Sequence, residues 1–170
     1  AHAVTETGVG HGGLGSGYYP RHNGIIANSW YMNEGTESIN CVEDDSVGIV
    51  STGESDIDPR SSRNLAVTGL ADWIEKADPE SKTYGISRKD RAAILLGGKN
   101  PDGAFWYDYD TGRFVSSTHY YRELPAWLNE FNLEDWPGQY FGQLWALTDK
   151  SRELLPRDDV VQSDYGWFRN

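Results

Sequence analysis

A threonine followed by glycines and a histidine stands near the beginning of the chain, in the stretch Thr7-Gly-Val-Gly-His11. A hydroxyl at the start of a helix lies close to free backbone N–H groups and to the positive end of the helix dipole, which together favour an anionic group. Such a hydroxyl can attack phosphorus and carry a phosphoryl group once its pKa is lowered, as a metal ion can do. From the residues alone, Thr5 or Thr7 could equally be only the N-cap of a helix.

The glycines of the same stretch match a nucleotide-binding fingerprint poorly. Gly8, Gly10 and Gly13 satisfy the pattern G-x-G-x-x-G. A dinucleotide site needs a hydrophobic strand before the glycines and an acidic residue about 20 positions after them. Here the preceding residues make a poor strand, and position 28 is an asparagine. No Gly-Lys-Ser/Thr follows the glycines, which excludes a P-loop. A nucleotide-binding oxidoreductase is therefore the least favoured interpretation.

Two cations, Lys89 and Arg91, are separated by a single residue. In an extended segment, residues two apart project to the same face, so this spacing predicts a pair that clasps one phosphate. Arginine can hold two phosphate oxygens in a fork, whereas lysine acts as a point charge. Taken alone, the sequence Lys-Asp-Arg is also typical of a solvated surface turn.

Composition narrows the possible partners of the chain. Its 170 residues carry a net charge of −11, which argues against a nucleic-acid partner but leaves room for a small phosphate bound by a few local cations. No apolar run approaches the roughly 18 residues of a membrane span, so no membrane partner is expected. Cys41 is the only cysteine and reads as a small, half-buried hydrophobe.

Periodicity predicts helices alternating with strands, and hence an α/β fold. Most tryptophans are expected in the core, and Asp108, Asp110 and Gly112 are expected to form a hairpin turn rather than a calcium loop. The expected elements are helices over residues 64–77, 90–98, 124–131 and 139–148, the first capped by Ser62 or Asn64, a strand over 83–87, and a β-hairpin over 104–118.

Several motifs follow one another along the chain: Thr7-Gly-Val-Gly-His11, Gly15-Ser-Gly-Tyr-Tyr-Pro20, His22-Asn-Gly-Ile-Ile-Ala-Asn28, Ser87-Arg-Lys89-Asp90-Arg91, Pro101-Asp-Gly-Ala-Phe-Trp-Tyr107 and Val115-Ser-Ser-Thr118. In this order they resemble the alkaline phosphatase superfamily, in its type I phosphodiesterase/nucleotide pyrophosphatase-like group, nearest to the periplasmic, phosphate-insensitive phosphomonoesterases. The resemblance implies a three-layer α/β/α sandwich. It also implies that Thr7 is the nucleophile, that the Asn28 amide donates to a phosphoryl oxygen, and that Lys89 and Arg91 contact the free oxygens of a monoester. His11 is then structural.

The same resemblance implies two zinc ions, yet the Asp and His motifs that hold them in relatives are absent from these 170 residues. Residues 1–170 are therefore expected to be the N-terminal-half fragment of one catalytic domain, with no metal ligands of their own. The parent would be a periplasmic or secreted phosphomonoesterase acting on small phosphate esters, and the isolated chain would be inactive. Two alternatives stay open: a diesterase, nucleotide pyrophosphatase or phosphonate hydrolase of the superfamily, and a non-catalytic anion-binding module.

Overall fold

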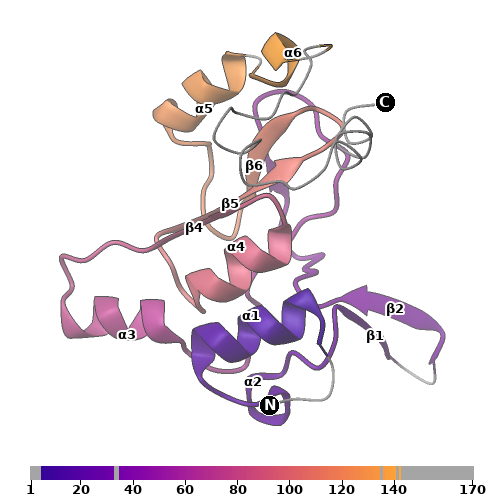
Figure 1. The fold of residues 1–170 in the computed structure, drawn as a ribbon, viewed down its shortest axis with the longest axis vertical. Helices are drawn as coiled ribbons and strands as arrows, with labels where there is room; N and C mark the ends of the chain where they lie inside the picture. The colour runs from indigo at the N-terminus through magenta and orange to yellow at the C-terminus, as the bar shows by residue number, and fades with distance from the viewer. Residues whose placement is uncertain (1–4, 33–34, 135, 141, 143–170) are drawn as a thin grey trace, which may run out of the picture. The chain divides into compact units, whose positions relative to one another are not determined.

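The computed structural model describes residues 5–32, 35–134, 136–140 and 142. The chain divides into two compact units, Ala1–Leu133 and Glu134–Asn170, and the second contains α6 (Trp136–Tyr140). The first unit carries all the other elements (Figure 1). These are α1 (Thr7–Ser16), α2 (Pro20–Asn23), β1 (Ser29–Met32), β2 (Glu37–Asn40), β3 (Ile49–Val50), α3 (Leu70–Ala77), β4 (Tyr84–Ser87), α4 (Asp90–Gly97), β5 (Gly103–Asp108), β6 (Arg113–Ser117) and α5 (Ala126–Leu133).

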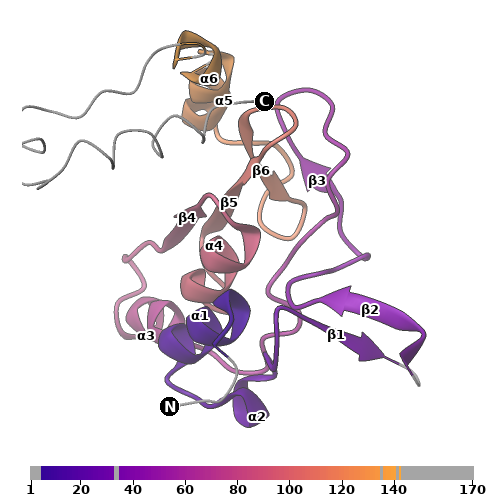
Figure 2. The same ribbon diagram turned by 45° about the vertical axis from the view of Figure 1, so that its right-hand side comes forward.

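A mixed sheet with the strand order β3-β6-β5-β4 forms the centre of the first unit. Strands β4 and β5 are parallel, with Tyr84 opposite Gly103, and α4 makes the crossover between them. Strands β5 and β6 form the expected antiparallel hairpin, which turns where Gly112 adopts a φ of 70°. Strands β1 and β2 make a separate antiparallel hairpin, which Figure 2 shows apart from the mixed sheet.

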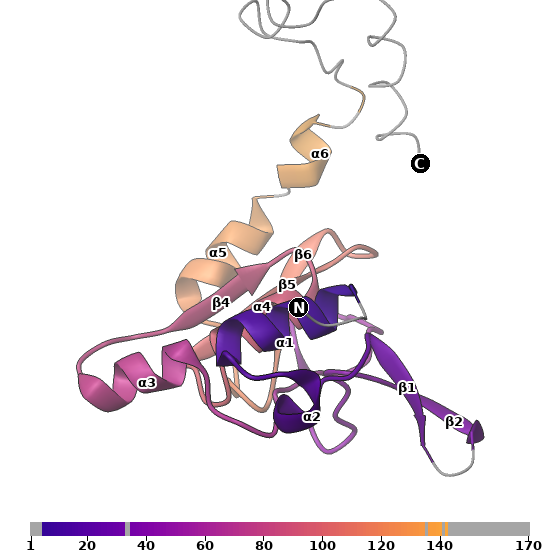
Figure 3. The same cartoon turned by 60° about the horizontal axis from the view of Figure 1, so that its bottom comes forward.

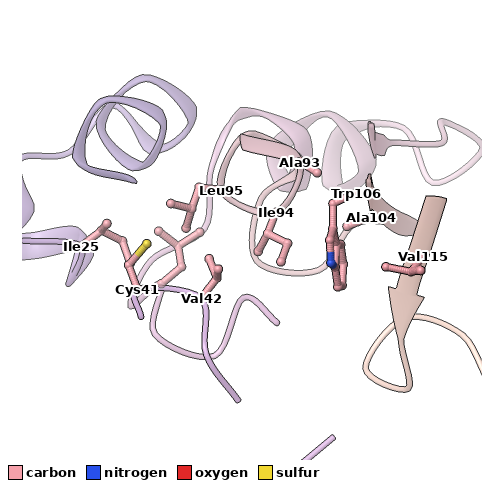
Figure 4. Close-up of a cluster of buried hydrophobic side chains, with 10 residues drawn as sticks. Ile25, Cys41, Val42, Ala93, Ile94, Leu95, Ala104, Trp106 and Val115 are labelled. Atoms are coloured by element: carbon pink, nitrogen blue, oxygen red, sulfur yellow. The ribbon is translucent and has the colours of Figure 1, made fainter. Parts of the chain in front are cut away.

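Strand β5 separates two hydrophobic clusters, because successive side chains of a strand point to opposite faces of the sheet. Ala104 and Trp106 pack with Ile94 of α4 in the larger cluster, which Figure 4 shows in close-up. Phe105, between them in sequence, packs with Leu128 of α5 in the second cluster. Helices α4 and α5 therefore cover opposite faces of the sheet, in agreement with the α/β fold that the sequence predicts.

Glycines let α4 fit tightly between the sheet and α1 (Figure 3). A Cβ atom on Gly85 of β4 would lie 2.0 Å from the carbonyl oxygen of Ala93 in α4. On the other side of the helix, a Cβ atom on Gly15 of α1 would lie 2.6 Å from the carbonyl oxygen of Leu95. Neither position can carry a side chain without moving backbone, so these two glycines set the spacing of the layers.

The helix expected over residues 64–77 is shorter, because it begins only at Leu70. Its N-cap is Gly69, whose N–H donates to the Asp72 side chain at 2.7 Å. Ser62 and Asn64, the expected caps, instead donate to the carbonyl oxygens of Lys99 and Cys41. The prediction was wrong because long-range hydrogen bonds hold residues 62–66 in a non-helical path.

The expectation that most tryptophans are core residues does not hold among the described residues. Of the five tryptophans in the part of the chain that the structure describes, Trp106 alone is fully buried, at 2% exposure. Trp73 of α3 and Trp127 of α5 are 44% and 51% exposed. Periodicity identified the apolar side of each helix, but it did not show how much of that side is covered.

The remaining predicted elements agree with the structure to within a few residues, except the helix expected over 139–148. Residues 141 and 143–148 of that segment lie outside the described residues, and α6 ends at Tyr140. Within the described residues, every helix is too short or too polar to cross a membrane.

Candidate active site

Helix α1 begins at Thr7, at the position that the glycine-rich sequence predicts. The Thr7 side chain is exposed, and Glu6 precedes it as the N-cap. His11 Nδ1 donates to the carbonyl oxygen of Thr7 at 2.7 Å, across the first turn. The structural role expected of His11 is therefore confirmed, because its ring closes the turn that carries the hydroxyl.

The side chain of Asn28 anchors this helix start from 20 residues further along the chain. Asn28 Oδ1 accepts the N–H of Gly8 at 2.7 Å, and the Asn28 N–H donates to the carboxylate of Glu6. Its carbonyl oxygen accepts the N–H of Cys41 at 2.9 Å. Because the amide oxygen faces the Thr7–Gly8 peptide, the amide nitrogen is the atom that would donate to a ligand at the helix start.

Gly8 allows this close contact between the helix start, Asn28 and the core. A Cβ atom at Gly8 would lie 2.8 Å from Cys41 Sγ and 3.2 Å from Asn28 Oδ1. Burial raises the pKa of the Cys41 thiol to about 11, and the nearby Arg91 charge only partly opposes this. Cys41 therefore stays a neutral thiol at physiological pH and acts as a buried hydrophobe beneath the site.

Lys89 and Arg91 do not lie in an extended segment, which corrects the basis of the sequence prediction. Strand β4 ends at Ser87, Lys89 is the N-cap of α4, and Arg91 is already the second residue of the helix. Helix α4 begins at Asp90, where the apolar pattern predicts it, and the Asp90 carboxylate accepts the Arg91 N–H at 2.7 Å. Both cations nevertheless belong to the same helix start, with Lys89 exposed and Arg91 half-buried.

Tyr109 is a site-facing residue that sequence reasoning missed. The Lys89 Nζ atom lies 5.3 Å from the centroid of its ring, and the Arg88 guanidinium carbon lies 4.8 Å from it. Tyr109 follows β5 directly, and the carboxyl ends of parallel β4 and β5 meet at one edge of the sheet. In sequence it reads as one residue of a hairpin turn, and no local signal pairs it with a lysine 20 positions away.

Of the four predicted site residues, Thr7 and Asn28 lie together at the start of α1, whereas Lys89 and Arg91 lie together at the start of α4. Gly15 near the end of α1 packs on Leu95 near the end of α4, and Gly8 near the start of α1 packs on Cys41. Cys41 in turn lies within electrostatic range of Arg91. The starts of both helices lie on the same side of the helix pair (Figure 1), with Thr7 and Asn28 at the start of α1 and Lys89 and Arg91 at the start of α4. Two helix starts on one side make it favourable for an anion.

The described residues do not by themselves fit a metal site. Within them, no three His, Cys, Asp or Glu side chains gather closely enough to bind an ion. The Asp108 carboxylate accepts from Ser55, Thr111 and the Asp110 N–H, as a hairpin turn requires. The pair Asp158-Asp159, which we interpret from the sequence as a surface or helix-start pair rather than a metal pair, lies outside the described residues.

In sequence and in fold the chain is similar to alkaline phosphatases, of which it is a homologue. It is 42% identical over 160 residues to "Alkaline phosphatase PafA" of Elizabethkingia meningoseptica, covering 94% of this chain and 28% of that protein. It is 43% identical over 142 residues to "Alkaline phosphatase PhoV" of Synechococcus elongatus, covering 83% of this chain and 26% of that protein. The predicted resemblance to the superfamily is thereby confirmed.

Solved structures give the same result for the fold. The crystal structure of wild-type PafA matches with a TM-score of 0.78 and 41% identity, covering 84% of this chain and 28% of the PafA chain. A PafA variant with four substitutions matches with a TM-score of 0.80 and 36% identity, covering 91% of this chain and 31% of that one. No family model matches the chain. The chain spans less than a third of the length of these relatives.

Proposed function

We propose that this chain is the nucleophile-bearing and phosphate-binding part of a longer phosphatase that hydrolyses phosphate monoesters through a phosphothreonine intermediate. The observation that carries the proposal is the hydrogen bond from the Gly8 N–H to Asn28 Oδ1, because it fixes an amide donor beside the Thr7 hydroxyl at a helix start. The similarity to PafA and PhoV supports phosphatase chemistry in that longer enzyme.

The substituted PafA variant gives independent support for the four site residues. Its four substitutions replace a threonine, an asparagine, a lysine and an arginine, in that order along the chain. Thr7, Asn28, Lys89 and Arg91 follow the same order. The threonine and asparagine are equally far apart in both chains, and one residue separates the lysine from the arginine in both.

The proposed reaction has two steps at phosphorus. In the first, the Thr7 hydroxyl oxygen bonds to phosphorus, its proton is lost, and the ester bond breaks to release the alcohol. In the second, water attacks the phosphothreonine, which restores the Thr7 hydroxyl and releases inorganic phosphate. The Asn28 amide nitrogen, Lys89 and Arg91 hold the phosphoryl oxygens during both steps, with stabilisation greatest where charge develops. A monoester dianion has enough free oxygens for all three donors.

A metal ion is implied by the homologues, and zinc specifically is part of the proposal. The described residues supply no ligand set for it, so we assign its ligands to the longer enzyme and derive no step through it. We propose that residues 1–170 are a fragment from the N-terminal half of a single catalytic domain, and that the parent is periplasmic or secreted. The last inference depends on the family resemblance alone.

The decisive experiment looks for the covalent intermediate. The full-length enzyme containing this segment is quenched in acid during turnover of p-nitrophenyl phosphate and analysed by peptide mass spectrometry. We expect a phosphoryl group on Thr7, and neither phosphorylation nor turnover in the variant Thr7→Ala. Turnover without modification of Thr7 would contradict the mechanism. Phosphate binding at the site with no turnover at all would instead favour an anion-binding module.

A second experiment tests the division of labour between this chain and the rest of the enzyme. The 170-residue chain, incubated with zinc and p-nitrophenyl phosphate, is expected to show no turnover above background. Without a bound metal, the pKa of a threonine hydroxyl stays far above neutral, and the hydroxyl is a poor nucleophile. Robust zinc-dependent turnover by the chain alone would show that the proposed division is wrong.

A further inference from the structure

A cluster of charged side chains around a largely buried arginine includes the first residue of α4. At its centre is Arg60, whose side chain is only 12% exposed. Its Nε atom lies 3.1 Å from Asp90 Oδ2, its Nη2 atom lies 3.1 Å from Asp58 Oδ2, and its Nη1 atom lies 3.8 Å from Glu43 Oε2. Arg60 thus joins three segments of the chain, and one of its partners is the first residue of α4.

The Asp90 carboxylate lies between two guanidinium groups. Its Oδ2 atom accepts from Arg60 Nε at 3.1 Å. Its Oδ1 atom accepts the Arg91 N–H at 2.7 Å and lies 3.6 Å from Arg91 Nε, which is too far for a hydrogen bond. Arg91 Nε is buried and has no hydrogen-bond partner within the described residues. Arg91 therefore neighbours a carboxylate that does not bind it in the two-point manner.

This arrangement matters because a carboxylate and a phosphate compete for the same fork of an arginine. A two-point ion pair would need both Asp90 oxygens facing Arg91, and Arg60 holds one of them. Removing Arg60 frees that oxygen and leaves the negative charge of the half-buried Asp90 carboxylate without its arginine partner. Both effects favour a two-point ion pair between Asp90 and Arg91 over the binding of phosphate by Arg91.

We propose that Arg60 is a positioning residue that restrains Asp90 and so leaves the terminal nitrogens of Arg91 free to bind the phosphoryl group. The proposal rests on the proposed function, in which Arg91 is a substrate ligand. It extends the site to a residue outside the four that are proposed to bind substrate.

The test is a double-mutant cycle in the full-length, metal-loaded enzyme. Arg60→Met keeps the length of the side chain and removes its charge. We expect it to lower kcat/KM for p-nitrophenyl phosphate, and to weaken inhibition by inorganic phosphate, by about tenfold. Adding Asp90→Asn removes the competing charge and should restore most of both losses. If the double variant is no better than Arg60→Met, or if Arg60→Met matches the wild type, the proposal is wrong.

Asp58 supplies a matched control, because it pairs with the same guanidinium but is 74% exposed and has no ion pair with Arg91 among the described residues. Adding Asp58→Asn to Arg60→Met should restore nothing. Equal rescue by Asp58→Asn would show that total charge, rather than Asp90, matters. If Arg60→Met fails to fold by circular dichroism, the same cycle is run with Arg60→Lys, where Asp90→Asn must again rescue the loss.

The variant Arg91→Ala, measured in the same assays, tests the proposed function separately from the positioning role of Arg60. If Arg91→Ala leaves phosphate inhibition unchanged, Arg91 is not a substrate ligand, and the proposed function fails together with this inference. If Arg91→Ala weakens inhibition strongly but Asp90→Asn does not rescue Arg60→Met, the proposed function stands and the role of Arg60 alone is refuted.

Discussion

The two halves of the candidate site are built in different ways. The half with Thr7 and Asn28 is held by hydrogen bonds that involve backbone atoms, from Gly8 to Asn28, from Asn28 to Glu6 and from Cys41 to Asn28. The half with Lys89 and Arg91 is held by charges, through Tyr109 on one side and Asp90 on the other.

The difference indicates which half is rigid. Backbone hydrogen bonds and the packing of Gly8 on Cys41 restrain the first half tightly. The exposed lysine over an aromatic ring has a weaker and less directional restraint. A nucleophile has to be aimed precisely, whereas cations that bind a phosphate tolerate some movement.

The strongest test of the difference in rigidity between the two halves is to separate the two roles of Asn28. Asn28→Ala removes both the anchor of Gly8 and the amide donor, so we expect kcat/KM of the full-length enzyme to fall about a hundredfold, as for other oxyanion donors. Asn28→Asp retains an oxygen that can accept the Gly8 N–H but places a negative charge at the phosphate. It should keep the melting temperature while losing activity. Similar melting losses for both variants would argue against the anchoring role.

A smaller effect is expected from filling the contact beneath the nucleophile. Gly8→Ala places a methyl group 2.8 Å from Cys41 Sγ, so the helix start must shift. We expect kcat/KM to fall by about tenfold, because a small displacement of a reacting group lowers the reaction rate strongly. Cys41→Ala removes the sulfur, and the double variant should recover part of the activity. If Gly8→Ala behaves like the wild type, the first half is less rigid than we infer.

The smallest effect should come from the ring beneath Lys89. Tyr109→Leu removes the aromatic face and is expected to raise KM for a phosphate monoester about threefold, with little change in kcat, since an exposed cation–π contact is weak. Tyr109→Phe keeps the face and should match the wild type. A loss of similar size in Tyr109→Phe would assign the effect to the hydroxyl, and a large loss of kcat would place Tyr109 closer to the chemistry.

Much of the local structure follows from local residues. The glycine-rich stretch places a helix start at Thr7, and the pattern of apolar residues predicts α4 and the β5–β6 hairpin, because capping, turn formation and periodicity act over a few residues. The residue types at Thr7, Asn28, Lys89 and Arg91 also suggested phosphate chemistry, although family motifs were needed to choose it over a surface turn.

The tertiary structure alone decided which groups meet. Gly8 packs on Cys41, Arg60 restrains Asp90, and Tyr109 lies beneath Lys89, although 20 to 33 positions separate each pair. The spacing of Lys89 and Arg91 suggested a pair on an extended segment, although the apolar pattern already predicted a helix beginning at Asp90, where α4 does begin. Short stretches of sequence thus indicate the residue types of the site, whereas its geometry depends on packing between residues that lie far apart in the sequence.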